Sequence, residues 1–147
     1  EVAHSEIEFS FNSDNTRIDM ICDRRQIAQT VTNLLKNAAE AISEANEIEG
    51  GRIFAILAAG EDEIVIEVSD NGPGFPQQRD RILEPYFTRK KSGSGLGLAI
   101  VQKIVEEHFG RIELADAEGG GASIRLIFSR TKLGAHSRVN SVPAQQD

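Results

Sequence analysis

The chain has 147 residues, 39% of them hydrophobic, which is enough for one domain with a substantial core. Its formal net charge of −7 argues against a protein that binds nucleic acid or anionic membranes. A single cysteine excludes an internal disulfide and no apolar run could cross a bilayer, so we expect a cytoplasmic chain whose parent protein could be anchored in the inner membrane.

The first part of the chain predicts two strands and a long helix. Alternating apolar residues predict strands over 7–11 and 18–22. Asp23 is a candidate N-cap for a helix over about 24–44, because Gln26 follows three residues later. The apolar residues that recur at helical spacing, and therefore share one face, are Ile27, Val31, Leu34, Leu35, Ala38 and Ile42.

The other strand patterns form two hairpins. Strands are predicted over 52–58 and 63–69, and again over 111–115 and 123–128. Helices and strands do not alternate regularly, which favours an α+β fold. We expect a two-layer sandwich with a mixed, mostly antiparallel sheet and helices on one face, within a domain that spans residues 1–131.

A polar, basic segment over about 76–95 is predicted to be a flexible lid with a short helix near 80–83. Within it, Phe87 belongs to a small aromatic cluster that would fasten the loop, while Lys90 and Lys91 would either neutralise phosphate or form a solvated turn. A second helix is predicted from Leu96 to Phe109, with Gly110 as its C′ residue. Residues 132–147 are polar and are expected to form a disordered tail.

Alternating glycines precede the second helix: Gly93, Gly95 and Gly97 are separated by Ser94 and Leu96 and followed by Leu98. Glycine lets backbone N–H groups approach a ligand closely, and a helix N-terminus carries about half a positive charge. The pattern predicts a phosphate site, with a plain flexible loop as the alternative. A Walker A loop is excluded because no lysine follows the last glycine, and a dinucleotide fingerprint is excluded because no strand directly precedes the glycines.

Polar residues elsewhere could complete a nucleotide site. Asn33 and Asn37 share one side of the first helix, where Asn37 could offer its carbonyl oxygen to Mg²⁺ or both could be solvated. Asp70 follows a strand and could accept a hydrogen bond from the exocyclic amine of adenine. Gly72 and Gly74 would then leave room for the ring, although a tight turn also explains this segment.

These features occur in an order that resembles one family. Residues 33–41, 70–74, 84–88 and 93–98 are similar to the N, G1, F and G2 boxes of the ATP-binding catalytic domain of sensor histidine kinases. That domain belongs to a superfamily that includes gyrase, the Hsp90 chaperones and the MutL ATPases. Residues 119–123 resemble its last glycine motif, with Ala122 where Thr is common. The residues of the N and F boxes most resemble those of the nitrogen-regulation sensor kinases of the NtrB and NtrY types.

The resemblance implies a Bergerat fold in which ATP or ADP lies between the helices beneath the lid. Asn37 would hold Mg²⁺ and Asp70 would bind adenine. The amides of Gly95, Gly97 and Leu98 would cradle the β- and γ-phosphates, assisted by Lys90 or Lys91. The implied nucleotide-binding residues are Asn33, Asn37, Asp70, Gly72, Gly74, Phe87, Lys90, Lys91, Gly93, Gly95, Leu96, Gly97, Leu98 and Ser123.

Asn33 separates the kinase branch from the ATPase branch of this superfamily. ATP-hydrolysing relatives carry Glu at that position, and a neutral amide cannot accept a proton at pH 7. We therefore expect the γ-phosphate to be donated to a histidine on a separate dimerisation domain, and then to a response regulator. The acceptor motif is not found around His4, His108 or His136, so the chain alone is expected to be monomeric and unable to phosphorylate itself.

Three alternatives stay open. An anti-sigma-type serine kinase of the same superfamily would act on a free partner protein. A nucleotide-sensing module would bind ATP without transferring phosphate. An unrelated α+β domain would use its glycine loops only for structure.

Overall fold

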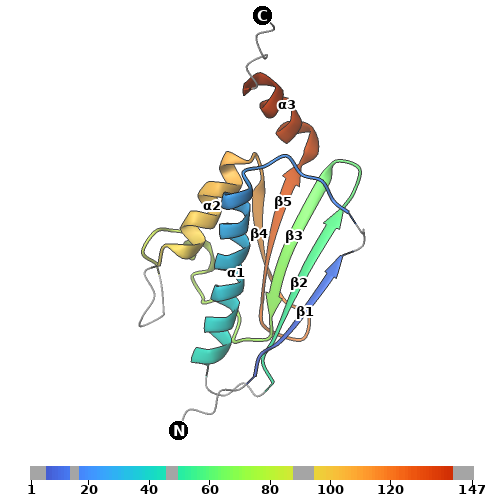
Figure 1. Ribbon diagram of the computed structural model, residues 1–147. Coiled ribbons are helices and arrows are strands. Elements are labelled where there is room, and N and C mark those ends of the chain that lie inside the picture. The colour runs from blue at the N-terminus through green and yellow to red at the C-terminus, as the bar shows by residue number, and fades with distance from the viewer. Residues whose placement is uncertain (1–5, 14–16, 46–49, 88–94, 141–147) are drawn as a thin grey trace, which may run out of the picture.

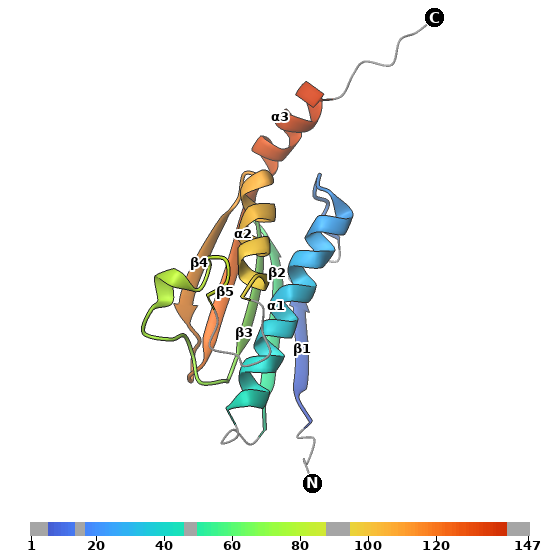
Figure 2. The same cartoon turned by 90° about the vertical axis from the view of Figure 1, so that its left-hand side faces the viewer.

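The computed structural model describes residues 6–13, 17–45, 50–87 and 95–140, with side chains described up to residue 135. Helices α1 (Arg24–Glu44) and α2 (Gly97–Glu107) cover the same face of a five-stranded sheet (Figure 1). The view along the sheet shows the two layers edge-on, with the opposite face of the sheet bare of helices (Figure 2). The predicted α+β sandwich is confirmed.

The sheet has the order β1-β2-β3-β5-β4. Its strands are β1 (Glu8–Ser13), β2 (Arg52–Ala59), β3 (Glu63–Asp70), β4 (Arg111–Asp116) and β5 (Ala122–Ser129). The pair β1–β2 is parallel, while β2–β3, β3–β5 and β4–β5 are antiparallel. Both predicted hairpins are therefore confirmed, and the central strand β3 delivers Asp70 to one end of the sheet.

The core lies between the helices and the covered face of the sheet. It combines Leu34, Ala38 and Ile42 of α1 with Val101 and Val105 of α2 and with Ile64, Val68, Ile124, Leu126 and Phe128 of β3 and β5. Burying such a side chain is worth about 1.5–3 kcal/mol. Thr30, which the apolar pattern does not include, is also fully buried. Its hydroxyl is satisfied there because it donates a hydrogen bond to the Gln26 carbonyl at 2.9 Å.

The two helices are joined at one end through a cap. The predicted N-cap is confirmed: the Asp23 carboxylate accepts hydrogen bonds from the Arg25 and Gln26 amides at 3.0 and 3.1 Å. The Asp23 amide in turn donates to Nε2 of His108 at 3.1 Å, and Nδ1 of that buried ring lies 2.8 Å from the Ile104 carbonyl. His108 thus fixes the end of α2 against the start of α1.

Helix α2 ends at Glu107, two residues earlier than predicted. Phe109 rather than Gly110 takes the left-handed C′ conformation, with φ 59°, and the Gly110 amide donates to the Val105 carbonyl at 2.9 Å. Gly110 is needed for a different reason. A Cβ there would lie 2.7 Å from the Ile127 carbonyl oxygen of β5, so the glycine allows close packing of the chain against the sheet.

Two local predictions are also corrected. Residues 18–22 form no strand; Ile18 and Met20 are partly buried against the core, so their alternation reflects one buried side of an extended segment without a ladder partner. The short helix of the lid region is a 3₁₀ turn at Arg79–Arg81, slightly before its predicted place.

The predicted disordered tail is wrong over residues 132–140, because helix α3 (Arg130–Asn140) continues directly from β5 beyond the end of the sheet (Figure 1). Asp62, in the turn between β2 and β3, holds the first turn of this helix. Its carboxylate accepts from the Thr131 amide and hydroxyl at 2.8 and 2.6 Å and from the Ser129 hydroxyl at 2.7 Å. Composition could not reveal a cap that comes from 69 residues away.

These hydrogen bonds lower the pKa of Asp62 to about 2, first through the Thr131 and Ser129 hydroxyls. Because the pKa of Asp62 is lower in the folded state than in the unfolded state, these hydrogen bonds add to folding stability above the ordinary carboxyl pKa. That stabilisation is lost as the pH falls toward 2. We expect Asp62→Ala to speed amide hydrogen exchange in the first turn of α3 and to leave β3 and β5 protected. Unchanged exchange at Thr131 and Lys132 would show that the helix does not depend on this cap.

Candidate functional site

Asp70 is a buried carboxylate at the end of β3, with 7% of its surface exposed. Its Oδ1 accepts hydrogen bonds from the Gly72 amide at 2.8 Å and the Ala122 amide at 3.4 Å. Burial raises the pKa of Asp70 and the two amides oppose this rise. Among the described residues both hydrogen bonds end on Oδ1, so Oδ2 is left to accept from a ligand N–H group.

Glycines pack directly around this carboxylate. A Cβ at Gly72 would lie 2.9 Å from the Asp70 Oδ1 atom, and one at Gly121 would lie 1.9 Å from the Asp70 carbonyl oxygen. Gly74 takes a φ of 85° and approaches the Gly121 carbonyl. Gly72 and Gly121 therefore let the loop and the β4–β5 hairpin close on Asp70 without a steric clash.

Asn71 anchors the same loop to β2. Its Oδ1 accepts from the Arg52 amide at 2.6 Å, its Nδ2 donates to the Gly50 carbonyl at 3.0 Å, and its own amide donates to the Arg52 carbonyl at 3.1 Å. The sequence suggests only a turn residue here. Its partners lie about 20 residues upstream, so their position became visible only once β2 and β3 were paired.

Helix α1 joins this loop to the start of α2. Asn33 donates through Nδ2 to the Gly97 carbonyl at 3.3 Å, and one side of Gly72 faces Ala41 and Ile42. Asn33 and Ala41 are separated by about 12 Å along the helix, and Asn37, which is partly buried, lies one turn from each. The structure thus brings Asn37 between the Asp70 loop and the first turn of α2.

The first turn of α2 begins with backbone amides that precede its helical hydrogen bonds. The residue that precedes it, Leu96, provides no side-chain cap, and the first helical hydrogen bond there runs from the Ile100 amide to the Leu96 carbonyl. The Gly97 and Leu98 amides therefore come before the hydrogen-bonded part of the helix. A Cβ at Gly97 would meet no described atom within 4 Å, so packing within the described chain does not require glycine there.

Gly95 and Phe87 serve the base of the lid. The Tyr86 amide donates to the Gly95 carbonyl at 2.9 Å, and a Cβ at Gly95 would lie 2.5 Å from the Tyr86 backbone. The Phe87 ring lies beneath the Arg81 guanidinium, 4.9 Å from its carbon to the ring centre. Lys90, Lys91 and Gly93, and with them the central part of the predicted lid, lie outside the described residues.

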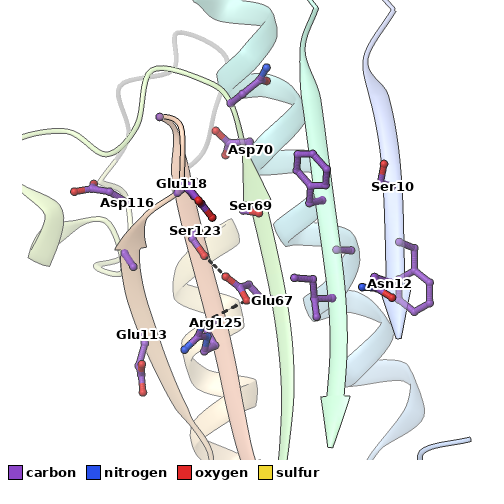
Figure 3. A pocket seen from close by; sticks show the side chains of 18 residues that line it. Ser10, Asn12, Glu67, Ser69, Asp70, Glu113, Asp116, Glu118, Ser123 and Arg125 are labelled. Atoms are coloured by element: carbon purple, nitrogen blue, oxygen red, sulfur yellow. Dashed lines mark hydrogen bonds and ion pairs between the residues drawn. The ribbon is translucent and has the colours of Figure 1, made fainter. Parts of the chain in front are cut away.

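Ser123 lies on the bare face of the sheet, away from α1 and α2. Its hydroxyl donates to Glu67 at 2.7 Å, and Arg125 pairs with the same carboxylate at 3.4 Å (Figure 3). The neighbouring Ile124 points into the core instead. The predicted nucleotide contact of Ser123 stays a prediction. The hydrogen bond to Asp70 comes from the backbone amide of Ala122, a residue that the sequence did not single out.

The bare face also holds a shallow depression of about 570 Å³, lined by residues of all five strands (Figure 3). Neither α1 nor α2 contributes to its lining. Asp70 and Asn71 contribute to the lining, so the depression borders the cluster formed by Asp70, Asn37 and Gly97 at the end of β3.

Known proteins match both the sequence and this arrangement. The model of the family described as histidine kinase-, DNA gyrase B- and HSP90-like ATPase matches residues 22–132. The chain belongs to this family. Nitrogen regulation protein NtrY of Azorhizobium caulinodans is 55% identical over 108 residues, which cover 71% of this chain and 14% of NtrY. A protein of Rickettsia prowazekii named as an NtrY-like sensor histidine kinase is 40% identical over 134 residues, 90% of this chain and 22% of that protein.

Solved structures agree with the family. The nucleotide-free catalytic domain of histidine kinase ThkA has a TM-score of 0.74 and 32% identity, covering 84% of this chain and 79% of that one. A second structure, ThkA with the response regulator protein TrrA, has a TM-score of 0.71 and 30% identity over 86% of this chain and 35% of that one. The predicted resemblance to a sensor histidine kinase catalytic domain is confirmed, and family membership implies nucleotide binding.

The chain spans 14% and 22% of the two curated relatives, so it corresponds to one part of proteins of that kind. Within the described residues, no helix combines the length and apolarity that crossing a membrane requires.

The buried carboxylate predicts a conflict between stability and binding. Because the folded pKa of Asp70 is raised, the native state binds more protons than the unfolded one just above the ordinary carboxyl pKa, and stability falls as pH rises through that window. We expect Asp70→Asn to increase the urea midpoint at pH 7, because a neutral amide is cheaper to bury. It should also weaken ADP binding by about 10–100-fold, because the amide cannot present two acceptor oxygens.

Urea unfolding and calorimetry on the same preparations test both halves of this expectation. A variant that loses stability would contradict the inferred cost of burying the charge, and one that binds ADP normally would contradict the role of Oδ2.

Proposed function

We propose that this chain binds Mg²⁺-ATP and donates the γ-phosphate to a histidine on a separate dimerisation domain, as the catalytic module of a two-component sensor kinase. In the parent protein the phosphoryl group then passes to a response regulator, in keeping with the structural relative solved with such a partner. The similarity to NtrY supports a nitrogen-regulation type of parent.

The observation that carries this proposal is the arrangement of Asp70. Two backbone amides hold Oδ1 of a buried carboxylate, and Oδ2 accepts no hydrogen bond from the described residues. An exocyclic amine such as that of adenine supplies the missing N–H donor. Since burial makes an unsatisfied acceptor costly, a matching donor would gain more here than it would at the surface.

The surroundings of Asn37 suit the metal and phosphate end of a nucleotide. No group of three or more His, Cys, Asp or Glu side chains gathers among the described residues, so a metal cage built by protein alone has no candidate there. Mg²⁺ commonly keeps several waters and binds one or two protein oxygens plus substrate phosphates. Asn37 would hold the ion, and the Gly97 and Leu98 amides would hold phosphate oxygens.

Asn33 favours transfer over hydrolysis. Its amide nitrogen is engaged with the Gly97 carbonyl, so this residue joins the two helices at the phosphate end and cannot act as a general base. The chain would orient the phosphates, neutralise their charge and exclude water, while the nucleophilic nitrogen comes from the acceptor histidine. Lys90 and Lys91 of the lid would add positive charge.

Calorimetry with ADP and Mg²⁺ tests the binding part. We expect wild-type protein to bind, and Asp70→Ala to weaken binding by about 10–100-fold because a buried charged hydrogen bond is lost. Asn37→Ala should weaken binding only when Mg²⁺ is present. Glu67→Gln, on the bare face, is the control and should bind normally. No heat with any adenine nucleotide would refute the proposal.

Labelled ATP tests the reaction. With one turnover of ATP, label should move to a supplied histidine-bearing dimerisation domain, whereas the chain alone should hydrolyse ATP slowly because general-base help worth about 10²–10⁴-fold is missing. Many turnovers per second without a partner would place the chain among the ATPases. Binding without transfer to the histidine domain would favour a sensing module, and transfer to a free sigma antagonist would favour the serine kinase.

A further inference from the structure

Arg79 connects the loop after Asp70 to the far strand of the sheet. It lies in the 3₁₀ turn at the start of the lid region, and its Nη2 donates to Oδ1 of Asp116, the last residue of β4. The guanidinium carbon also lies 4.8 Å from the centre of the Phe75 ring. Phe75 is itself partly buried against the core, so the arginine is held from two sides.

The hairpin that Arg79 reaches is the one that already holds Asp70. Ala122, the first residue of β5, donates its amide to Asp70, and Gly121 packs on the Asp70 backbone. The loop over residues 71–79 therefore begins beside the β4–β5 hairpin, where Asp70 contacts Ala122, and contacts the hairpin again where Arg79 binds Asp116. Figure 3 shows Asp70 and Asp116 on either side of the hairpin turn that carries Glu118.

Stability alone does not account for this second attachment. The Arg79 and Asp116 side chains are 38% and 75% exposed, and exposed ion pairs contribute only about 0–1 kcal/mol to folding. The loop that they close, however, contains Gly72, Pro73, Gly74 and Pro76, and its hydrogen bonds to β2 and β3 come from Asn71 and Gly72 at its beginning. A loop attached at one end would have to be ordered when a ligand binds, and that ordering weakens affinity.

We propose that Arg79 is a positioning residue for nucleotide binding: tied to Asp116 and stacked on Phe75, it holds the Asp70–Gly72 loop in its binding arrangement before the ligand arrives. This inference rests on the proposed nucleotide function. Arg79 does not touch the ligand. It acts by keeping the loop and the base of the lid fixed to the β4–β5 hairpin.

A double-mutant cycle on the chain tests the inference, with ADP and Mg²⁺ as the probe. Arg79→Ala and Asp116→Ala should each raise the Kd for ADP by about 2–12-fold, the range expected from ordering one flexible segment. The double variant should bind ADP no more weakly than the weaker-binding single variant, because both substitutions remove the same Arg79–Asp116 attachment. Urea midpoints should stay close to wild type, and hydrogen exchange over residues 71–78 should become faster.

Rescue separates positioning from a general structural defect. The exchanged pair Arg79→Asp with Asp116→Arg should recover part of the affinity, because the ion pair re-forms while the stacking on Phe75 is lost. Arg79→Lys should give an intermediate Kd for ADP, because lysine keeps the positive charge but lacks the planar group that stacks on Phe75. Arg111→Ala is the matched control: this arginine pairs with Glu113 and Glu63 at the other end of β4, and its loss should not alter ADP binding.

The outcomes distinguish the two proposals. If wild type binds ADP and Arg79→Ala binds equally well, or if the two single effects simply add, the positioning role is refuted and the nucleotide function stands. If Arg111→Ala weakens binding as much as Arg79→Ala, the effect belongs to charge in general and the inference also fails. If wild type binds no adenine nucleotide, the proposed function fails and takes this inference with it.

Discussion

The buried carboxylate of Asp70 is the constraint on which the rest of the site depends. A charged group with 7% exposure needs hydrogen-bond donors, and the chain provides two backbone amides from two different segments. One comes from the turn that follows β3 and the other from the start of β5. Because neither amide can be reached if a side chain intervenes, Gly72 and Gly121 follow from the position of Asp70.

The sheet order makes this meeting possible. β3 and β5 are neighbours, with Ser69 opposite Ser123, so the end of one strand faces the beginning of the other. The hairpin turn between β4 and β5 then lies beside the loop that leaves β3. Two further contacts reinforce the arrangement: Asn71 binds the start of β2, and Arg79 returns to the end of β4. The loop is consequently attached to three strands besides its own.

The helices supply the other half of the site through their spacing. His108 and Asp23 join α1 and α2 at one end, and Asn33 joins them again where α2 begins. Two attachments along a pair of packed helices fix both separation and register, so Asn37 has a defined place relative to the Gly97 amide. The same residue that joins the helices, Asn33, is the one that cannot serve as a base. The proposed preference for phosphoryl transfer over hydrolysis and the packing of the two helices thus depend on the same side chain.

Local patterns were sufficient for most elements and for the candidate residues. Helix α1 with its Asp23 cap and the four hairpin strands follow from periodicity and capping chemistry, which act over a few residues. The ordered boxes around Asn37, Asp70 and Gly97 predicted the family, because the order of motifs can be recognised in the sequence without any knowledge of contacts.

Long-range contacts decided the rest. The Asp62 cap made a helix of residues that composition assigns to a disordered tail. Strand alternation placed the Ser123 side chain beside Glu67 on the bare face, while the backbone of Ala122 binds Asp70. The partnership of Arg79 with Asp116 spans 37 residues. Sequence alone therefore determined which residue types are available and in what local conformation. The tertiary structure decided which of them meet, because hydrogen bonds and close packing depend on distances that only the paired sheet and its two helices establish.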